Sequence, residues 1–250
     1  MKKFFVILGL VFVCITAFAH SVEWYVDGSL YQTTTCDAGD SITPPTAPAK
    51  YGYHFVKWSA YTQLEYIEST GTQYIDTGYS APEGFVLKIQ LMVLNNKRSA
   101  IFGSHDPTAP YGRNDLFLSE GRRFEFGADY AMITNFSVNS DEIYDITLST
   151  VKNDVFFSVK EPYFYSKYEN ASYLSSNNLY LFDINGYTFD NFIGRIYSAQ
   201  IYDNDVLVRD LIPAKRNSDN AVGMYDTVTN TFFTNAGTGE FIAGPEVGDL

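Results

Sequence analysis

The sequence predicts an all-β protein, built mainly as an antiparallel β-sandwich of the jelly-roll kind. After residue 20, apolar residues alternate with polar ones along many short segments, which is the period of a strand and not of a helix. The chain of 250 residues holds 20 Tyr and 20 Phe, and aromatic residues favour strands. Turn residues separate the segments at short intervals, as they do in two-sheet sandwiches.

The chain opens on a predicted signal peptide, residues 1–19, which we expect to be helical. Two lysines precede an apolar run over residues 4–18. Ala17 and Ala19 then supply the small residues that signal peptidase requires, which makes His20 the first mature residue. The run of about 15 residues is short beside the ~20 that span a bilayer, so we expect no membrane span after its removal. A retained membrane anchor is the alternative.

The charge balance bears on the class of partner. The chain carries 17 basic and 29 acidic side chains, which gives a formal net charge of −12. Residues 1–19 hold two lysines and no acid, so the mature chain carries 15 − 29 = −14. Such a chain repels phosphate backbones, and nucleic acid is therefore not an expected partner.

Cysteine usage points to an exported bacterial protein. Cys14 would leave with the signal peptide, so Cys36 is the single thiol of the mature chain. A secreted chain without an internal disulfide must be held by an ordinary hydrophobic core, for which it is long enough. We expect it at the cell envelope or surface, or outside the cell.

Residues 20–60 form the first predicted domain, a small β unit. Val22, Trp24 and Val26 alternate, and a tight turn at Asp27-Gly28 starts a return strand. The unit carries an ordered set of motif residues: Trp24-Tyr25-Val26-Asp27-Gly28, Tyr31, Gly39-Asp40, Pro45, Gly52-Tyr53, Phe55 and Trp58.

This motif, over residues 22–58, resembles the Listeria–Bacteroides repeat of bacterial surface proteins, which is similar to the internalin B-repeat. The resemblance implies a compact β-grasp-like module that serves as a spacer or a protein-contact unit. One departure is that Lys57 precedes Trp58 and the second domain begins at once, where the family often continues with another strand.

Residues 61–250 form the second predicted domain, with a longer series of strands. The clearest is residues 85–93, where five apolar side chains share one face and Lys88 and Gln90 the other. Hairpin turns are expected at residues 152–154, 185–186 and 203–205. Further strands are expected at residues 99–103, 115–118, 123–126, 143–151, 155–159, 179–184, 193–202, 206–212, 222–225 and 231–234.

Motifs near both ends of this domain resemble the laminin-G-like, concanavalin-A-like jelly roll of bacterial exported proteins. That fold hosts lectins, glycosidases and adhesion modules alike, so it does not fix a function. The motifs are residues 66–78 (Tyr-Ile-Glu-Ser-Thr-Gly-Thr-Gln-Tyr-Ile-Asp-Thr-Gly), Gly194-Arg195-Ile196-Tyr197-Ser198, Ile201-Tyr202-Asp203, residues 208–213, Gly223-Met224-Tyr225-Asp226 and residues 234–239.

Catalysis is not expected. A glycosidase needs two carboxylates across the scissile bond, and the Glu-x-Asp-x-Glu strand of glucanases with this fold is absent. Glu65 and Glu68 would point to opposite sides of a strand, and Glu120 and Glu125 straddle a turn. No Gly-x-Ser-x-Gly elbow accompanies the three histidines, and their spacing does not suit zinc.

The candidate ligand site is the irregular loop over residues 105–115. Tyr111, Arg113, Asn114 and Asp115 combine an aromatic ring with hydrogen-bonding groups, as sugar binding requires. The aromatic stretch at residues 163–165 is a second candidate platform. For both, packing within the sheets is the alternative reading.

No cofactor is expected. Ca²⁺ remains an alternative because oxygen-rich turns such as Asp203-Asn204-Asp205 occur, although turn chemistry explains those residues equally well.

The sequence therefore predicts a secreted or surface-exposed bacterial binding or adhesion protein without catalytic activity. Its expected partner is a glycan, bound through the jelly roll, or a surface protein. One alternative is a carbohydrate-active hydrolase or an accessory module of one. A second alternative is a structural spacer in a cell-envelope assembly.

Overall fold

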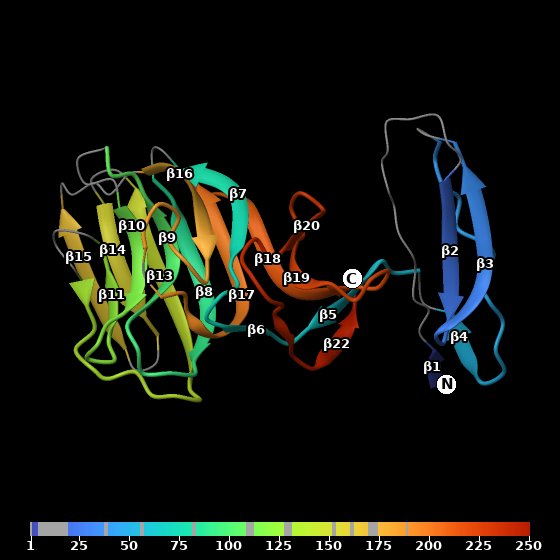
Figure 1. Cartoon of the computed structure of the whole chain (residues 1–250), viewed down its shortest axis with the longest axis horizontal. Coiled ribbons are helices and arrows are strands. Elements are labelled where there is room, and N and C mark those ends of the chain that lie inside the picture. Colours follow the sequence, from blue (N-terminus) through green and yellow to red (C-terminus); the bar gives the residue numbers. More distant parts are fainter. Residues whose placement is uncertain are drawn as a thin grey trace. The chain divides into compact units, whose positions relative to one another are not determined.

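The computed structural model describes residues 2–4, 20–37, 40–55, 58–81, 84–108, 113–127, 132–151, 154–160, 163–169, 175–188 and 190–250. These ranges contain strands and turns and no helix, which confirms the all-β prediction (Figure 1). Most of the predicted signal peptide, including Ala17 and Ala19, lies outside them. Lys2–Phe4 is described and forms a short strand, β1, where the start of a helix was expected. His20 is the first residue of strand β2.

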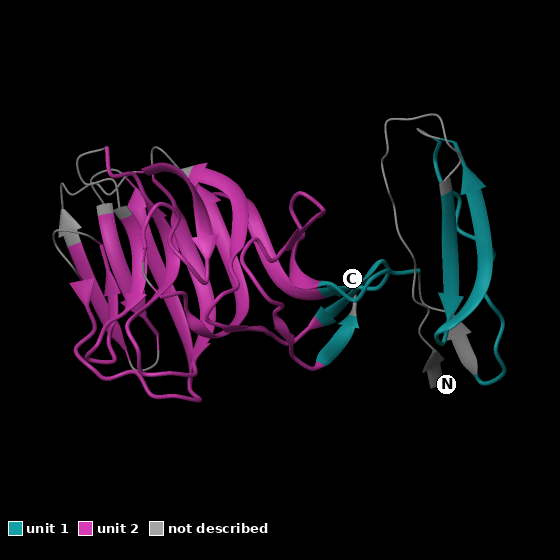
Figure 2. Cartoon of the chain, in the orientation of Figure 1, with its two compact units in different colours: residues 1–63, 215–221, 246–250 teal, residues 64–214, 222–245 magenta. Residues whose placement is uncertain are grey.

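The chain divides into two compact units (Figure 2). The first comprises residues 1–63, 215–221 and 246–250, and the second comprises residues 64–214 and 222–245. The chain thus passes into the second unit between Gln63 and Leu64 and returns twice to the first.

The first unit contains the predicted hairpin. β2 (His20–Val26) pairs antiparallel with β3 (Ser29–Cys36) around a turn in which Asp27 and Gly28 have φ of 49° and 75°. β1 pairs in parallel with β4 (Tyr53–Phe55). Val22 and Trp24 are buried on one face, where the Trp24 ring meets that of Trp58 edge to face at 4.9 Å. Two further strands of this region are β5 (Tyr61–Leu64) and β22 (Glu246–Asp249), which pair with each other.

The second unit is a sandwich of two sheets. The smaller sheet runs in the order β12 (Met132–Ile133), β11 (Phe124–Phe126), β10 (Arg113–Leu118), β9 (Ser99–His105), β16 (Ser175–Leu181) and β7 (Ile75–Ala81). The larger runs in the order β15 (Phe164–Glu169), β14 (Asp154–Val159), β13 (Ile143–Val151), β8 (Val86–Val93), β17 (Ile193–Asp203), β18 (Val206–Arg216), β19 (Val222–Asp226) and β20 (Thr231–Thr234). β6 (Ile67–Thr70) also pairs with β17, and β21 (Ile242–Ala243) pairs with β6.

The hydrophobic core lies between the inward faces of the two sheets. On β8 the alternation predicted from the sequence is confirmed: Leu87, Ile89 and Leu91 are at most 3% exposed, whereas Lys88 is exposed. The smaller sheet contributes Leu116 and other inward side chains of β9, β10 and β16 to the same core. Burial of this continuous apolar layer is the main force that holds the sandwich together.

The predicted hairpin turns follow the expected chemistry. Between β17 and β18, Asn204 and Asp205 both have positive φ, 46° and 64°, as two-residue hairpin loops require. Gly186, with φ of 82°, ends the segment after β16 as expected. The turn predicted at residues 152–154 lies largely outside the described residues.

Candidate functional site

The outer face of the smaller sheet, turned away from the core, carries the candidate site. Side chains directly opposite each other on paired strands point to the same side of a sheet. Phe117 on β10 is opposite Ala100 on β9 and Glu125 on β11, and Glu125 is opposite Ile133 on β12. Leu116 is in the core, so this row of four residues lies on the other face.

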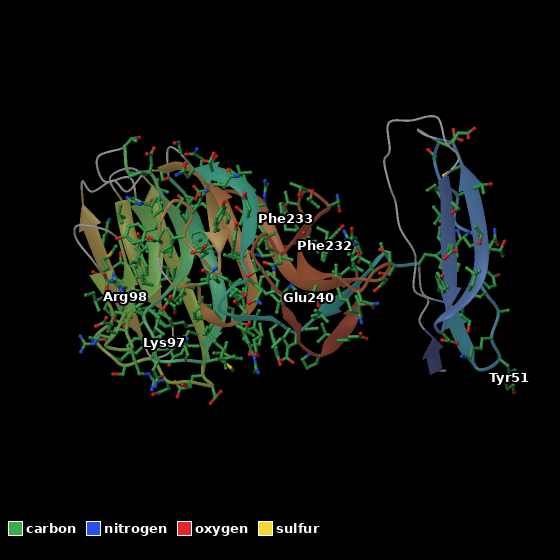
Figure 3. All side chains as sticks on the ribbon, viewed as in Figure 1. Tyr51, Lys97, Arg98, Phe232, Phe233 and Glu240 are labelled. Atoms are coloured by element: carbon green, nitrogen blue, oxygen red, sulfur yellow. The ribbon has the colours of Figure 1, made fainter. Side chains whose placement is uncertain are left out.

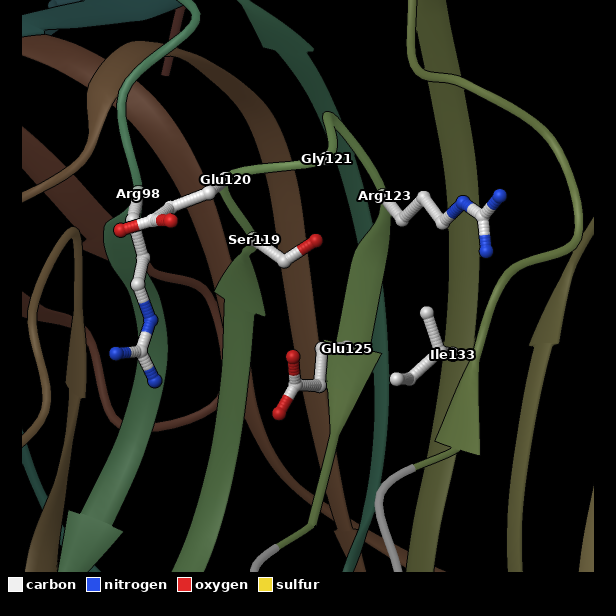
Figure 4. A pocket seen from close by; sticks show the side chains of 7 residues that line it. All are labelled: Arg98, Ser119, Glu120, Gly121, Arg123, Glu125 and Ile133. Carbon is white, nitrogen blue, oxygen red and sulfur yellow. The ribbon is translucent and has the colours of Figure 1, made fainter.

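A pocket of about 500 Å³ opens on this face (Figure 4). It is built by the start of β9, the turn between β10 and β11, and the strands β11 and β12. The turn is tight, because Ser119 N–H donates to Arg123 O at 2.9 Å and Arg122 N–H donates to Ser119 O at 3.0 Å. The lining residues are Arg98, Ser119, Glu120, Gly121, Arg123, Glu125 and Ile133.

The aromatic ring of Phe117 orients the guanidinium group of Arg98, one of the two cationic groups that line the pocket. The Arg98 guanidinium lies over this ring, 5.4 Å from its centroid, which is a favourable cation–π geometry. Phe117 itself is fully buried, and the ring of Tyr187 approaches it edge-on at 6.5 Å. Ala100 and Ile184 complete this small apolar cluster beneath Arg98. The Arg98 side chain is therefore held against a rigid base.

The remaining lining groups are mixed in charge. In Figure 4 the carboxylate of Glu125 points to the side on which Arg98 lies, whereas Arg123 extends the other way. Ile133 adds an apolar surface and is 43% exposed. Two guanidinium groups can donate hydrogen bonds, two carboxylates can accept them, and the Ser119 hydroxyl can do both. Such a set suits a ligand rich in hydroxyl groups.

The structure describes the side chains of two of the four residues predicted as the ligand site, Asn114 and Asp115. Tyr111 lies outside the described residues. Arg113 begins β10, but its side chain is not described. Asn114 and Asp115 are 0% exposed within β10, opposite Ser104 and Gly103 of β9. These two polar residues therefore belong to the sheet and not to an exposed loop.

The second predicted platform is exposed in part. Tyr163 and Tyr165 are 77% and 52% exposed, and the ring of Tyr165 stacks on that of Phe156 at 6.2 Å. Phe164 instead packs against the core. Phe156 and Tyr165 lie on β14 and β15 of the larger sheet, with Tyr163 just before β15, and none of the three lines the pocket.

Sequence reasoning missed the pocket because its parts come from separate segments. The structure brings Glu120 and Glu125 to one pocket, where the sequence placed them on two sides of a turn. Arg123, just before β11, and Glu125 within it alternate with the buried Phe124 and Phe126, which is the available signal that both point outward. The contribution of Arg98 depends on the pairing of β9 with β10.

The described residues contain no group of three or more His, Cys, Asp or Glu that could hold a metal ion. At the turn before β18, the Asp203 carboxylate accepts hydrogen bonds from neighbouring side chains. Asn204 Nδ2 donates to it at 2.8 Å. Burial, together with the hydrogen bond that the Tyr79 hydroxyl donates to Asp203, raises the pKa of Tyr79 to about 12. Within the part of the chain that the structure describes, no helix could cross a membrane.

Comparison with known proteins gives a fold and no family. No protein-family model matches the sequence, so none supports the likeness of residues 22–58 to the Listeria–Bacteroides repeat. No curated protein matches it either. Among solved structures, a "putative carbohydrate binding protein" from Bacteroides ovatus is similar with a TM-score of 0.52 and 12% identity, over 92% of this chain and 68% of the other.

Two further structures are more distant. A SAP-like pentraxin from Limulus polyphemus has a TM-score of 0.45 and 9% identity, over 75% of this chain and 95% of that one. Domains LG4-5 of the mouse laminin α1 chain have a TM-score of 0.42 and 13% identity, over 74% of this chain and 52% of that one. The jelly-roll β-sandwich predicted from the sequence is confirmed.

Proposed function

We propose that this protein binds carbohydrate without transforming it, and that the outer face of the smaller sheet carries the site. The observation that carries the proposal is the pocket of Figure 4, in which Arg98, Arg123, Glu120 and Glu125 line one space. The described fold is also that of a protein named for carbohydrate binding.

The chemistry of the pocket favours a sugar over other small ligands. Each sugar hydroxyl both donates and accepts a hydrogen bond, so it needs donors and acceptors close together. Arginine and glutamate provide planar groups that can each make two such bonds. With two side chains of each sign, the lining is close to neutral. An uncharged glycan therefore suits it better than a strongly anionic one.

The proposed setting is the cell envelope or the medium. Support comes from the features of residues 1–19, with a basic start, an apolar run and a small-residue cleavage site. A surface lectin or adhesin whose partner is a glycan fits both the predicted export signal and the acidic charge of the chain predicted to follow it.

One observation favours a second candidate, glycoside hydrolysis. Glu120 and Glu125 line the same pocket, and a glycosidase uses two carboxylates about 5–5.5 Å or about 6.5–9.5 Å apart according to its stereochemistry. The non-catalytic proposal expects no release of reducing ends from any bound glycan. Release that Glu125→Gln abolishes would overturn it.

A glycan array with residues 20–250 tests the proposal, with and without Ca²⁺. Binding should be weakened about tenfold or more by Glu125→Gln or Arg98→Ala, because each removes hydrogen bonds to the ligand. Glu240→Gln is the matched control, since Glu240 is exposed and well separated from Arg98 in Figure 3. The absence of glycan binding both with and without Ca²⁺ would refute the proposal and favour protein adhesion or a spacer role.

A further inference from the structure

We propose that the binding site does not end at the pocket but continues across the smaller sheet to a pair of stacked tyrosines, Tyr74 and Tyr180. The ligand would then be an oligosaccharide chain rather than a single sugar. This inference rests on the proposed function and adds the length and orientation of the ligand.

The register of the sheet places Tyr180 on the same face as the pocket. Asp115 shares the outward side of β10 with Phe117, and it is opposite Gly103 of β9. Gly103 is in turn opposite Tyr180 of β16, and Tyr180 is opposite Asp76 of β7. The neighbours of Tyr180 on β16, Leu179 and Leu181, are fully buried in the core. Tyr180 and Asp76 therefore lie on the outer face.

The two tyrosines form a fixed aromatic surface. Their ring centroids are 4.8 Å apart and their planes differ by 21°. Two hydrogen bonds fix the backbone of Tyr74. Its N–H donates to Asn235 Oδ1 at 3.1 Å, and its C=O accepts from Ala236 N–H at 2.9 Å. Both residues are half-buried, and Tyr74 also packs against the edge of the core. A flat, partly exposed ring is a suitable surface for the C–H face of a sugar.

Polar groups border this aromatic pair. Asp76 Oδ1 accepts from Asn178 Nδ2 at 3.1 Å and from Gly78 N–H at 2.9 Å, which fixes its carboxylate beside the rings. The half-buried carboxyl of Asp183 accepts from Ile184 N–H at 2.7 Å. Burial, followed by electrostatic interactions with Asp76, Tyr74 and Asp183, raises the pKa of Tyr180, and the register places Asp76 directly opposite Tyr180. Aromatic surface and hydrogen-bonding groups thus occur together.

Tyr187 extends the aromatic surface from the pocket toward the end of β9. Its half-buried ring lies against Phe117 beneath the pocket and also meets the His105 ring edge-on at 5.0 Å. From β11 to β16 there are three strand spacings, or about 14 Å at the usual distance between paired strands. That distance is several times the length of one sugar ring. An oligosaccharide lying across the strands would therefore be needed to reach both the pocket and the tyrosine pair.

Calorimetric titration with glycans of increasing length tests the extension, using the shortest array ligand and its longer homologues. Tyr180→Ala should weaken binding of the longest homologue by about five- to tenfold and leave the shortest unchanged. Glu125→Gln should weaken both. Tyr180→Phe, which keeps the ring, should bind nearly as the parent does, and a matching melting temperature would show that the fold is intact.

Tyr165→Ala is the matched control, because Tyr165 is also exposed but lies on the larger sheet. If Tyr180→Ala weakened all lengths equally or none, the extension would be wrong while the pocket could stand. If Tyr165→Ala gave the length-dependent loss instead, the chain would run over the larger sheet. Failure of every glycan to bind would refute the proposed function and the extension together.

Discussion

Arg209 of β18 forms an ion pair, at 3.6 Å, with the fully buried carboxylate of Asp226 on β19. The same side chain donates from Nε to Thr77 O at 3.0 Å and from Nη2 to Gly78 O at 3.3 Å. One guanidinium group therefore ties β7 of the smaller sheet to two strands of the larger one. The residues of this contact come from three of the motifs that marked the jelly roll in the sequence.

Loss of this cation should destabilise the sandwich strongly. Arg209→Ala leaves the Asp226 charge buried without its cation, so we expect unfolding to become easier by about 3 kcal/mol. Arg216→Ala is the control, because its partner Asp219 is exposed and such pairs contribute about 1 kcal/mol or less. Denaturant unfolding followed by circular dichroism measures both. Equal effects would contradict the assigned role of Arg209.

Gly103 should not tolerate a side chain. Its φ is 141°, and a Cβ there would lie 1.9 Å from Asn114 O on the paired strand. Gly103→Ala should therefore separate β9 from β10 locally and cost about 2–4 kcal/mol of stability. Gly248→Ala, where a Cβ has nothing within 4 Å, should be nearly neutral. A Gly103→Ala protein as stable as the parent would contradict the close approach of β9 to β10 at this residue.

Stability should fall as Asp183 ionises. Burial, opposed by the hydrogen bond from Ile184, raises the pKa of Asp183 to about 6, above the usual ~3.9. Between those values the folded state binds more protons than the unfolded chain, so this carboxyl reduces stability as pH rises through that window. Asp183→Asn keeps the acceptor for Ile184 N–H and removes the charge.

We therefore expect Asp183→Asn to be more stable than the parent above pH 6 and to lose this advantage as pH falls toward 4. Thermal melts at a series of pH values check this. An advantage that stays constant across the series would indicate an effect other than ionisation.

Tryptophan fluorescence should report on the first unit alone. The sequence holds two tryptophans, and Trp24 and Trp58 meet edge to face there. Trp58→Ala removes the ring that covers Trp24 and the hydrogen bond to Pro45 O, so the Trp24 emission should shift to the red. Trp58→Phe keeps an aromatic cover and should shift it less. An unchanged spectrum in the Ala variant would exclude the packing of Trp24 on Trp58.

The sequence supported the strands better than the site, and particular residues show why. Along β8 the alternation of apolar and polar residues identifies the inward side chains. Successive side chains of a strand point to opposite faces of the sheet, whichever strand pairs with it. Pro107, Pro110 and Gly112 predict an irregular loop that reaches Asn114 and ends at Asp115, where the predicted strand begins. The place of Asn114 and Asp115 in β10 depends on pairing with Ser104 and Gly103, which no local pattern encodes.

The candidate site could not be predicted for the same reason. Arg98 and Glu125 share a pocket only because β9, β10 and β11 pair in one register, and Tyr74 meets Tyr180 only because β7 pairs with β16. Long-range pairing is set by the packing of the whole core and not by local preferences.

The pairing of β5 with β22 determines how the protein would bear a mechanical load. Leu250 N–H donates to Tyr61 O at 3.1 Å, Ser59 Oγ donates to Leu250 O at 2.7 Å, and Glu65 N–H donates to Pro245 O at 2.8 Å. The strands that lead into and out of the sandwich are thus joined side by side. Tension between them would break these bonds one after another before the smaller sheet, which carries the proposed ligand site, was strained.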